Sequence, residues 1–235
     1  CPEHLGETAC AISLADLQPA APVPPPVHYK TKILKPFKAW RDKVVVDVGC
    51  REGPLGRKLT PHNFVLGVDC CPKALLTASP NALDAGYRFL LIADGAALPL
   101  SDATVDLVVA TDVLEHVLLP EKLIHEAHRV LKPGGLLLTT VPNLVSYNNR
   151  LSILLGYGAG VEVHQLLQGR SPFIPINGPR YPDQRKHLRW FTAASLRRVL
   201  TDCGFQVERT FGYDPLLSRL PGLDRLLRGW CLLAG

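Results

Sequence analysis

Five short apolar segments recur between residues 44 and 143, separated by helical or turn-rich stretches. Each segment is continuous rather than alternating, which is expected of strands covered on both faces of a sheet. Strands that alternate with helices are typical of a parallel sheet with right-handed crossovers. The predicted strands are VVVDVG (44–49), FVLGVD (64–69), FLLIAD (89–94), VDLVVATD (105–112) and GLLLTTVPN (135–143).

Helical periodicity is clearest in EKLIHEAHRVL (121–131), where apolar residues recur at helical spacing. Pro120 stands where a first-turn proline is tolerated, and Pro133-Gly134-Gly135 is expected to end the helix. Residues 144–156, after the fifth strand, also have a helical pattern.

The C-terminal part adds a helix and two strands to this pattern. A helix is predicted from about Ala193 to Cys203, with Thr192 as its N-cap and Gly204 in its C-terminal turn. FQVERTF (205–211) predicts a sixth strand, and the final GWCLLAG predicts a seventh strand that is cut short. The fold class is therefore α/β, with a doubly wound, mostly parallel, seven-stranded sheet.

Residues 1–28 precede this pattern and contain PAAPVPPPV. Proline removes backbone donors and favours an extended chain, so we expect a tail or linker here. Residues 29–235 are expected to form one domain. Within it, residues 44–143 form the ligand-binding core, and residues 144–190, which end in an irregular stretch rich in Gly and Pro, form a substrate cap.

Composition narrows the class of protein. Apolar residues make up 47% of the chain and charged residues 20%, as in ordinary globular domains. No apolar run approaches the roughly 18 residues of a membrane span, so no transmembrane segment is expected. The net charge of +5 is spread along the chain and predicts no nucleic-acid partner. Seven cysteines without a CxxC pair indicate reduced thiols in a cytoplasmic protein, with neither a disulfide framework nor a metal site.

Polar residues stand at the ends of successive predicted strands. Asp47 lies in the closing turn of the first, Asp69 ends the second, Asp94 ends the third, and Thr111-Asp112 ends the fourth. In an open α/β sheet, ligands bind beyond the carboxyl ends of the strands. The four strand ends therefore predict one shared binding site.

The first of these ends is followed by a glycine-rich turn, DVGCREGPLG (47–56). Gly49 and Gly53 let the backbone turn sharply and leave room for a ligand. The spacing G-x-x-x-G-x-x-G differs from the fingerprint of a dinucleotide site, and no GK[ST] follows, which disfavours a nucleoside triphosphate.

Asp69 stands twenty residues after Gly49, the usual separation for an acid that accepts hydrogen bonds from ribose hydroxyls. Asp94, next to Gly95, is placed to face an exocyclic amine of a base. The ligand implied has a ribose and a base but no phosphate. S-adenosylmethionine fits this description.

The ordered motifs also resemble a known family. VVVDVGCREG (44–53) resembles the first motif of class I S-adenosylmethionine-dependent methyltransferases, and GVD (67–69) resembles their second. ADGAALPLSDATVDLVVATDVLEHV (93–117) resembles the third and fourth motifs of the type 11 group. RVLKPGGLLLTTVPN (129–143) and HLRWFTAASLRRVLTDCGF (187–205) resemble later segments. The resemblance covers roughly residues 44–211 and implies methyl transfer to a small-molecule acceptor.

The resemblance also implies which part of the cofactor each strand end would contact. The methionine part would meet residues after the first and fourth strands: Asp47, Gly49, Gly53, Thr111 and Asp112. Among these, Asp47 would help to hold the ammonium group. Asp69 would bind the ribose hydroxyls, and Asp94 and Gly95 would meet the adenine.

Arg51 departs from the family, which usually has a glycine at this position. Its side chain must point away from the cofactor, because it would otherwise set a positive charge near the sulfonium. The departure keeps a non-catalytic, methyltransferase-like binding module open as an alternative. A nicotinamide-dependent oxidoreductase on a related fold is a further alternative, which the glycine spacing disfavours.

Acceptor recognition is expected from the irregular regions. His187 is a candidate catalytic base, because an unperturbed imidazole pKa of about 6.5 suits proton transfer, and a packing histidine is the alternative. Glu115-His116 either borders the substrate or fixes the next helix. Four cations indicate either an anionic acceptor or a solvated rim: Arg180, Arg185, Lys186 and Arg189.

Overall fold

The computed structural model describes residues 33–51, 58–59, 62–72, 74–75, 87–156, 187–212 and 231–234. The predicted tail at residues 1–28 and residues 157–186 of the predicted cap lie outside them. Within the described part of the chain, no helix has the length and hydropathy needed to cross a bilayer.

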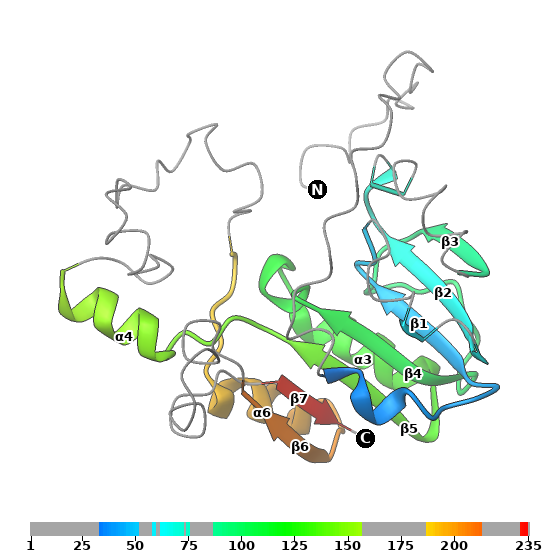
Figure 1. The fold of residues 1–235 in the computed structure, drawn as a ribbon. Helices are drawn as coiled ribbons and strands as arrows, with labels where there is room; N and C mark the ends of the chain where they lie inside the picture. The colour runs from blue at the N-terminus through cyan, green and yellow to red at the C-terminus, as the bar shows by residue number, and fades with distance from the viewer. Residues whose placement is uncertain are drawn as a thin grey trace.

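Five parallel strands form the centre of the fold in the order β3-β2-β1-β4-β5 (Figure 1). Their bounds are β1 (Val44–Val48), β2 (Phe64–Asp69), β3 (Phe89–Ile92), β4 (Val105–Thr111) and β5 (Leu131–Thr140). Burial is almost complete along β1, β2 and β4, in agreement with their continuous apolar sequences. The predicted α/β fold with parallel strands is confirmed.

Two C-terminal strands extend the sheet beyond β5. β7 (Cys231–Ala234) pairs antiparallel with β5, and β6 (Val207–Phe211) pairs antiparallel with β7, which gives the sheet order β3-β2-β1-β4-β5-β7-β6. Both strands lie where the sequence predicts strands. They attach beside β5, so they take no part in the pairing of β1 with β2 and β4.

Alternate residues of the strands pack into two apolar clusters on opposite faces of the sheet. Val46 and Val48 of β1 belong to the cluster covered by α3 (Pro120–Val130) and α6 (Ala193–Asp202). Val45 belongs to the cluster covered by η2 (Lys35–Phe37). Figure 1 shows α3 and α6 on one side of the sheet and η2 on the other.

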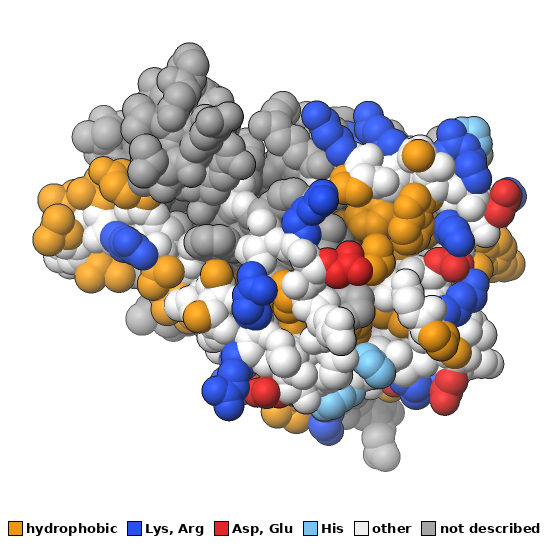
Figure 2. Space-filling model, turned by 90° about the horizontal axis from the view of Figure 1, so that it is seen from below, with side chains coloured by type: hydrophobic (Ala, Val, Ile, Leu, Met, Phe, Trp, Pro, Cys, Tyr) orange, Lys and Arg blue, Asp and Glu red, His pale blue; other side chains and the backbone are white. Residues whose placement is uncertain are grey.

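α4 (Tyr147–Leu154) begins at Ser146, whose hydroxyl accepts from the amide of Asn149, and extends away from the sheet (Figure 1). Figure 2 shows apolar side chains over this end of the molecule. Ile153 and Leu154 are 54% and 82% exposed.

β5 begins four residues earlier than its sequence predicts. The backbone of Leu131 is already extended and pairs with Val105 of β4, so α3 ends at Val130 rather than at Leu131. The register then shifts, and the next pair is Leu107 with Leu136. The Pro-Gly-Gly segment therefore forms an irregularity inside the strand, and pairing with β4 overrides its turn-forming composition.

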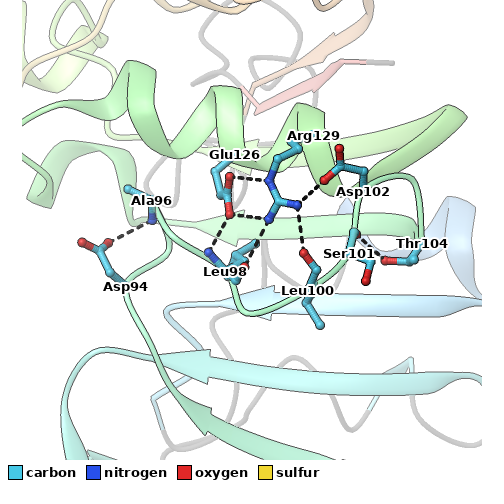
Figure 3. A network of polar contacts seen from close by, with 9 residues as sticks. All are labelled: Asp94, Ala96, Leu98, Leu100, Ser101, Asp102, Thr104, Glu126 and Arg129. Carbon is cyan, nitrogen blue, oxygen red and sulfur yellow. Dashed lines mark hydrogen bonds and ion pairs between the residues drawn. The ribbon is translucent and has the colours of Figure 1, made fainter.

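Arg129 of α3 holds the loop between β3 and β4 (Figure 3). Its guanidinium donates to the backbone carbonyls of Leu98 and Leu100 at 3.1 and 2.9 Å, and it pairs with the carboxylates of Glu126 and Asp102. Glu126 also accepts from the Leu98 amide at 2.7 Å. These contacts fix the loop that follows the β3 end of the sheet.

A capping box starts α6 and so fixes the segment that precedes it. The Thr192 hydroxyl accepts from the Ser195 amide at 3.1 Å, and the Ser195 hydroxyl accepts from the Thr192 amide at 2.9 Å. At the other end of α6, Gly204 has a φ of +95°, as predicted for its C-terminal turn. The predicted caps of this helix are confirmed.

Thr192→Ala is expected to lower the free energy of unfolding by about 1 kcal/mol, because it removes the N-cap acceptor. Urea denaturation measures the change. Thr201→Ala is the matched control, since Thr201 lies within α6 and its exposed hydroxyl donates only to the Arg197 carbonyl. Equal losses in the two variants would show that the cap contributes nothing of its own.

Candidate functional site

The carboxyl ends of β1, β2 and β4 meet at one edge of the sheet, because these strands are parallel neighbours. The turn after β1 begins at Gly49, whose φ of +69° favours glycine. Its amide donates to the Val68 carbonyl of β2 at 2.7 Å. A Cβ at Gly49 would lie 2.6 Å from a methyl group of Val113, which follows β4. The left-handed backbone and the close approach of Val113 therefore both require glycine at position 49. Gly53 lies outside the described residues.

Asp69, the last residue of β2, is only 8% exposed. Its Oδ2 accepts from the Arg51 amide at 3.0 Å, and its Oδ1 accepts from the Cys71 amide at 2.9 Å. A carboxylate has about four acceptor positions, so two backbone bonds orient Asp69 while it still has capacity for hydroxyl donors. This geometry suits the predicted contact with a ribose.

Arg51 has a φ of +46°, the left-handed conformation that favours glycine. For a residue with a Cβ this conformation costs about 1–2 kcal/mol. The position at which the family usually has glycine thus keeps a glycine-like backbone here. Its amide bond to Asp69 is made by the backbone and does not depend on the side chain.

Asp47 lies inside β1 rather than in the closing turn where the sequence places it. Its carboxylate is 3% exposed and accepts from the Tyr87 hydroxyl at 2.6 Å. Burial, together with the charges of Asp47 and Asp69, raises the pKa of the neighbouring Cys50 thiol. Cys50 is therefore a protonated packing residue at neutral pH rather than a nucleophile.

Asp94 and Gly95 begin the loop that Arg129 anchors. Asp94 is exposed, and its Oδ1 accepts from the Ala96 amide at 2.9 Å, which closes a tight turn. A Cβ at Gly95 would lie 2.6 Å from a Val48 methyl group of β1 and 3.1 Å from Leu123 of α3. Glycine thus lets this loop approach the β1 end.

Thr111 and Asp112 close β4 at the same edge. Thr111 is 7% exposed, and Asp112 has a φ of +55°, an uncommon conformation for a non-glycine residue. Thr140 of β5 holds it there: its carbonyl accepts from the Asp112 amide at 3.0 Å, and its hydroxyl donates to Oδ1 of Asp112 at 2.9 Å. Residues fixed in such conformations cluster at functional sites.

His187 lies against the segment that follows β4. Its ring contacts the ring of His116, with centroids 5.0 Å apart, and that of Trp190, with centroids 5.2 Å apart. The next two amides, of Leu188 and Arg189, both donate to the carbonyl of Glu115, which lies in η5 (Leu114–His116). One ligand atom each from Glu115, His116 and His187 lies within 4.8 Å of the others.

Burial lowers the pKa of His187 below its ordinary value of 6.5, and the negative charge of Asp112 opposes this shift. His187 is therefore neutral at pH 7 and able to accept a proton. Its ring contact with His116 of η5 places His187 beside the segment that follows β4.

The structure thus brings most of the predicted site to one edge of the sheet: Asp47, Gly49, Asp69, Gly95, Thr111, Asp112 and His187, with the exposed Asp94 in the adjoining loop. Arg180, Arg185 and Lys186 lie outside the described residues. Arg189 donates to the Leu118 carbonyl and so helps to dock the His187 segment.

Three residues that position this site have no recognisable signal in the sequence. Tyr87 holds Asp47, Val113 fills the space beside Gly49, and Thr140 holds Asp112. Tyr87 and Asp47 are 40 positions apart, and Thr140 and Asp112 are 28 apart. Pairing of β4 with β5 brings Thr140 to Asp112, whereas Tyr87 precedes β3 and reaches Asp47 of β1 across the intervening β2.

Comparison with known proteins also indicates a methyltransferase. Residues 46–139 match a family described as a methyltransferase domain. This range contains β2, β3 and β4, most of β1 and β5, and the described strand-end residues of the site, whereas His187 lies outside it.

Curated relatives extend the match. The chain is 31% identical over 182 residues to a ubiquinone biosynthesis O-methyltransferase of Chromobacterium violaceum, which covers 74% of the chain and 70% of the relative. It is 33% identical over 173 residues to a probable S-adenosylmethionine-dependent methyltransferase of Mycolicibacterium smegmatis, which covers 72% of the chain. The chain spans about half the length of that second relative, 54%.

A solved S-adenosylmethionine-dependent methyltransferase from Aquifex aeolicus has a similar fold, with a TM-score of 0.56 at 18% identity over 87% of each chain. These matches agree with the order β3-β2-β1-β4-β5, with the parallel direction of these strands and with the turn at Gly49. The chain belongs to the S-adenosylmethionine-dependent methyltransferases.

Proposed function

We propose that this protein transfers a methyl group from S-adenosylmethionine to a hydroxyl group of a small molecule. The carboxylate of Asp69 carries the cofactor half of the proposal, since it is buried at the β2 end and oriented by two backbone amides. The hydroxyl half rests on His187 and on the O-methyltransferase relatives.

The described residues fit the cofactor. Asp69 offers acceptors for two ribose hydroxyls, and Gly49 adds no side chain of its own to the turn after β1. Asp94 and Gly95 lie in a loop fixed by Arg129, where an adenine would contact backbone as well as the carboxylate. The methionine end would reach Asp112 at the close of β4.

The acceptor is proposed to lie between the β4 end and the His187 segment. When bound, S-adenosylmethionine supplies a methyl group attached to a good leaving group. The protein therefore has to align the acceptor oxygen, exclude water and receive the hydroxyl proton. His187 is the proposed proton acceptor, at a ring nitrogen, and its contacts with His116 and Trp190 hold the ring in place.

The wider organisation follows from this assignment. We propose that residues 29–235 form the methyltransferase domain, completed as a seven-stranded sheet, with residues 44–143 as the cofactor core. Residues 144–190 would recognise the acceptor, because they connect β5 to the segment that carries His187 and docks on Glu115. The basic residues at the end of this region suit an acceptor that carries negative charge.

Asp69→Ala is expected to weaken S-adenosylmethionine binding by about 10- to 100-fold, because charged hydrogen bonds contribute roughly 1.5–3 kcal/mol. Asp69→Asn keeps one acceptor oxygen and should lie between Asp69→Ala and the wild type. Isothermal titration measures the affinity, and a thermal melt checks that each variant is folded. Asp202→Ala, an exposed aspartate of α6, is the control. Unchanged affinity in folded Asp69→Ala would refute the cofactor assignment.

His187→Gln is expected to reduce the turnover number by about 10²- to 10⁴-fold while S-adenosylmethionine affinity stays the same, because it removes the base but no cofactor contact. In the wild type the base is active when neutral. Since burial lowers its pKa, the rate should hold at pH 7 and fall only on acidification below 6.5. Labelled cofactor with a panel of phenols, alcohols and amines measures the rate. A variant with the wild-type rate and pH profile would exclude His187 as the base.

Arg51→Gly and Arg51→Ala test whether position 51 needs a backbone conformation or a side chain. Both variants remove the guanidinium, but only glycine removes the left-handed strain. The glycine variant is expected to be more stable than the alanine variant by about 1 kcal/mol, measured by urea denaturation. Both should retain cofactor binding, because the amide bond to Asp69 remains. Loss of binding in both would mean that the guanidinium itself contributes to the site.

A further inference from the structure

A second cavity lies at the opposite end of the strands from the cofactor site. It has a volume of about 380 Å³, and its lining includes Asn63, which directly precedes β2. Lys43, two residues after the lining residue Arg41, directly precedes β1. We propose that this cavity binds a small molecule in which a phosphate or carboxylate is attached to a flat apolar group.

Among the residues that the structure describes, the lining of this cavity includes cations and no carboxylate. Three of its residues are cations and a fourth is a histidine: Lys38, Arg41, Lys58 and His62. The nearby Lys43 is paired with Asp106 at 3.6 Å and Lys58 has an interaction partner of its own, so the positive charge offered to a ligand comes mainly from Lys38 and Arg41. A site with this lining favours an anion.

Apolar and aromatic side chains complete the lining. Phe37 is 2% exposed and Trp40 is half-buried, with ring centroids 5.0 Å apart in an edge-to-face arrangement. Leu59 adds an aliphatic surface. Flat apolar groups pack well against such rings, so the anion is expected to carry one.

The walls of the cavity are held together by a buried amide. The side-chain nitrogen of Asn63 donates to the carbonyls of Leu59 and Trp40 at 2.8 and 3.2 Å, and its oxygen accepts from the Lys43 amide at 3.1 Å. Arg41 Nη1 donates to the carbonyls of Lys38 and Trp40 at 3.0 and 2.9 Å, which holds the guanidinium over its own segment. The backbone of the cavity walls and the Arg41 guanidinium are thus held in place.

The size of the cavity limits its occupant. Small-molecule pockets range from about 300 to 1,000 Å³, and this cavity lies near the lower limit. A single aryl anion is small enough for this open cavity and can contact the Trp40 ring and the neighbouring cations together.

Phenyl phosphate is the probe for this site, with inorganic phosphate and phenol as the two halves of its chemistry. Titration calorimetry on the whole protein should show phenyl phosphate binding at least about tenfold more tightly than either half, because both contacts are made together. Lys38→Gln and Trp40→Leu should each weaken this binding by about threefold or more. Lys35→Gln is the matched control, since Lys35 lies in η2 but does not line the cavity.

Three outcomes would overturn the proposal. Phosphate alone binding as tightly as phenyl phosphate would indicate an adventitious ion only. Equal effects of Lys35→Gln and Lys38→Gln would indicate general charge attraction. Binding to phosphatidylserine vesicles without binding to phenyl phosphate would indicate a membrane surface. The Asp69→Ala variant should keep its affinity for phenyl phosphate, which separates this site from the cofactor site. Thermal melts establish that the Trp40→Leu variant is folded.

Discussion

The carboxylate of Asp69 joins the two turns on which the proposed cofactor site depends. Its two oxygens accept the amides of Arg51 and Cys71, so it links the turn after β1 to the turn after β2. A carboxylate that is already oriented by the backbone needs no rearrangement before it accepts further donors. The same group therefore stabilises the edge of the sheet and prepares it for a ligand with two neighbouring hydroxyls.

Because the strands are parallel, acidic residues gather at their carboxyl ends and basic residues at their amino ends. The carboxyl ends of β1, β2 and β4 bring acids together, among them Asp69 and Asp112. The amino ends bring together the basic segment that leads into β1 and the loop that leads into β2, with Asn63 between them. A site that favours a sulfonium cofactor and a site that favours an anion can therefore share one sheet without competing for ligands.

Local signals predict much of this fold from the sequence. Continuous apolar runs predict the parallel strands, and Thr192 and Gly204 mark the ends of α6 because capping depends on a few adjacent residues. The separation between Gly49 and Asp69 predicts that Asp69 is the acid that faces a ribose at the β2 end. The Pro-Gly-Gly segment misleads, since pairing of Leu131 with β4 extends β5 through it.

Contacts made across the sheet lie beyond such signals. The bond from Tyr87 to Asp47 joins the residues before β3 to β1 across the intervening β2, and the docking of Leu188 on the Glu115 carbonyl depends on a connection of about seventy residues. At Arg51, the sequence suggests a defect that the structure does not show. A glycine motif interrupted by arginine suggests a damaged site, yet the backbone adopts the left-handed conformation and its amide still binds Asp69. The motif specifies a backbone path, and a residue with a side chain can follow that path at a conformational cost of about 1–2 kcal/mol.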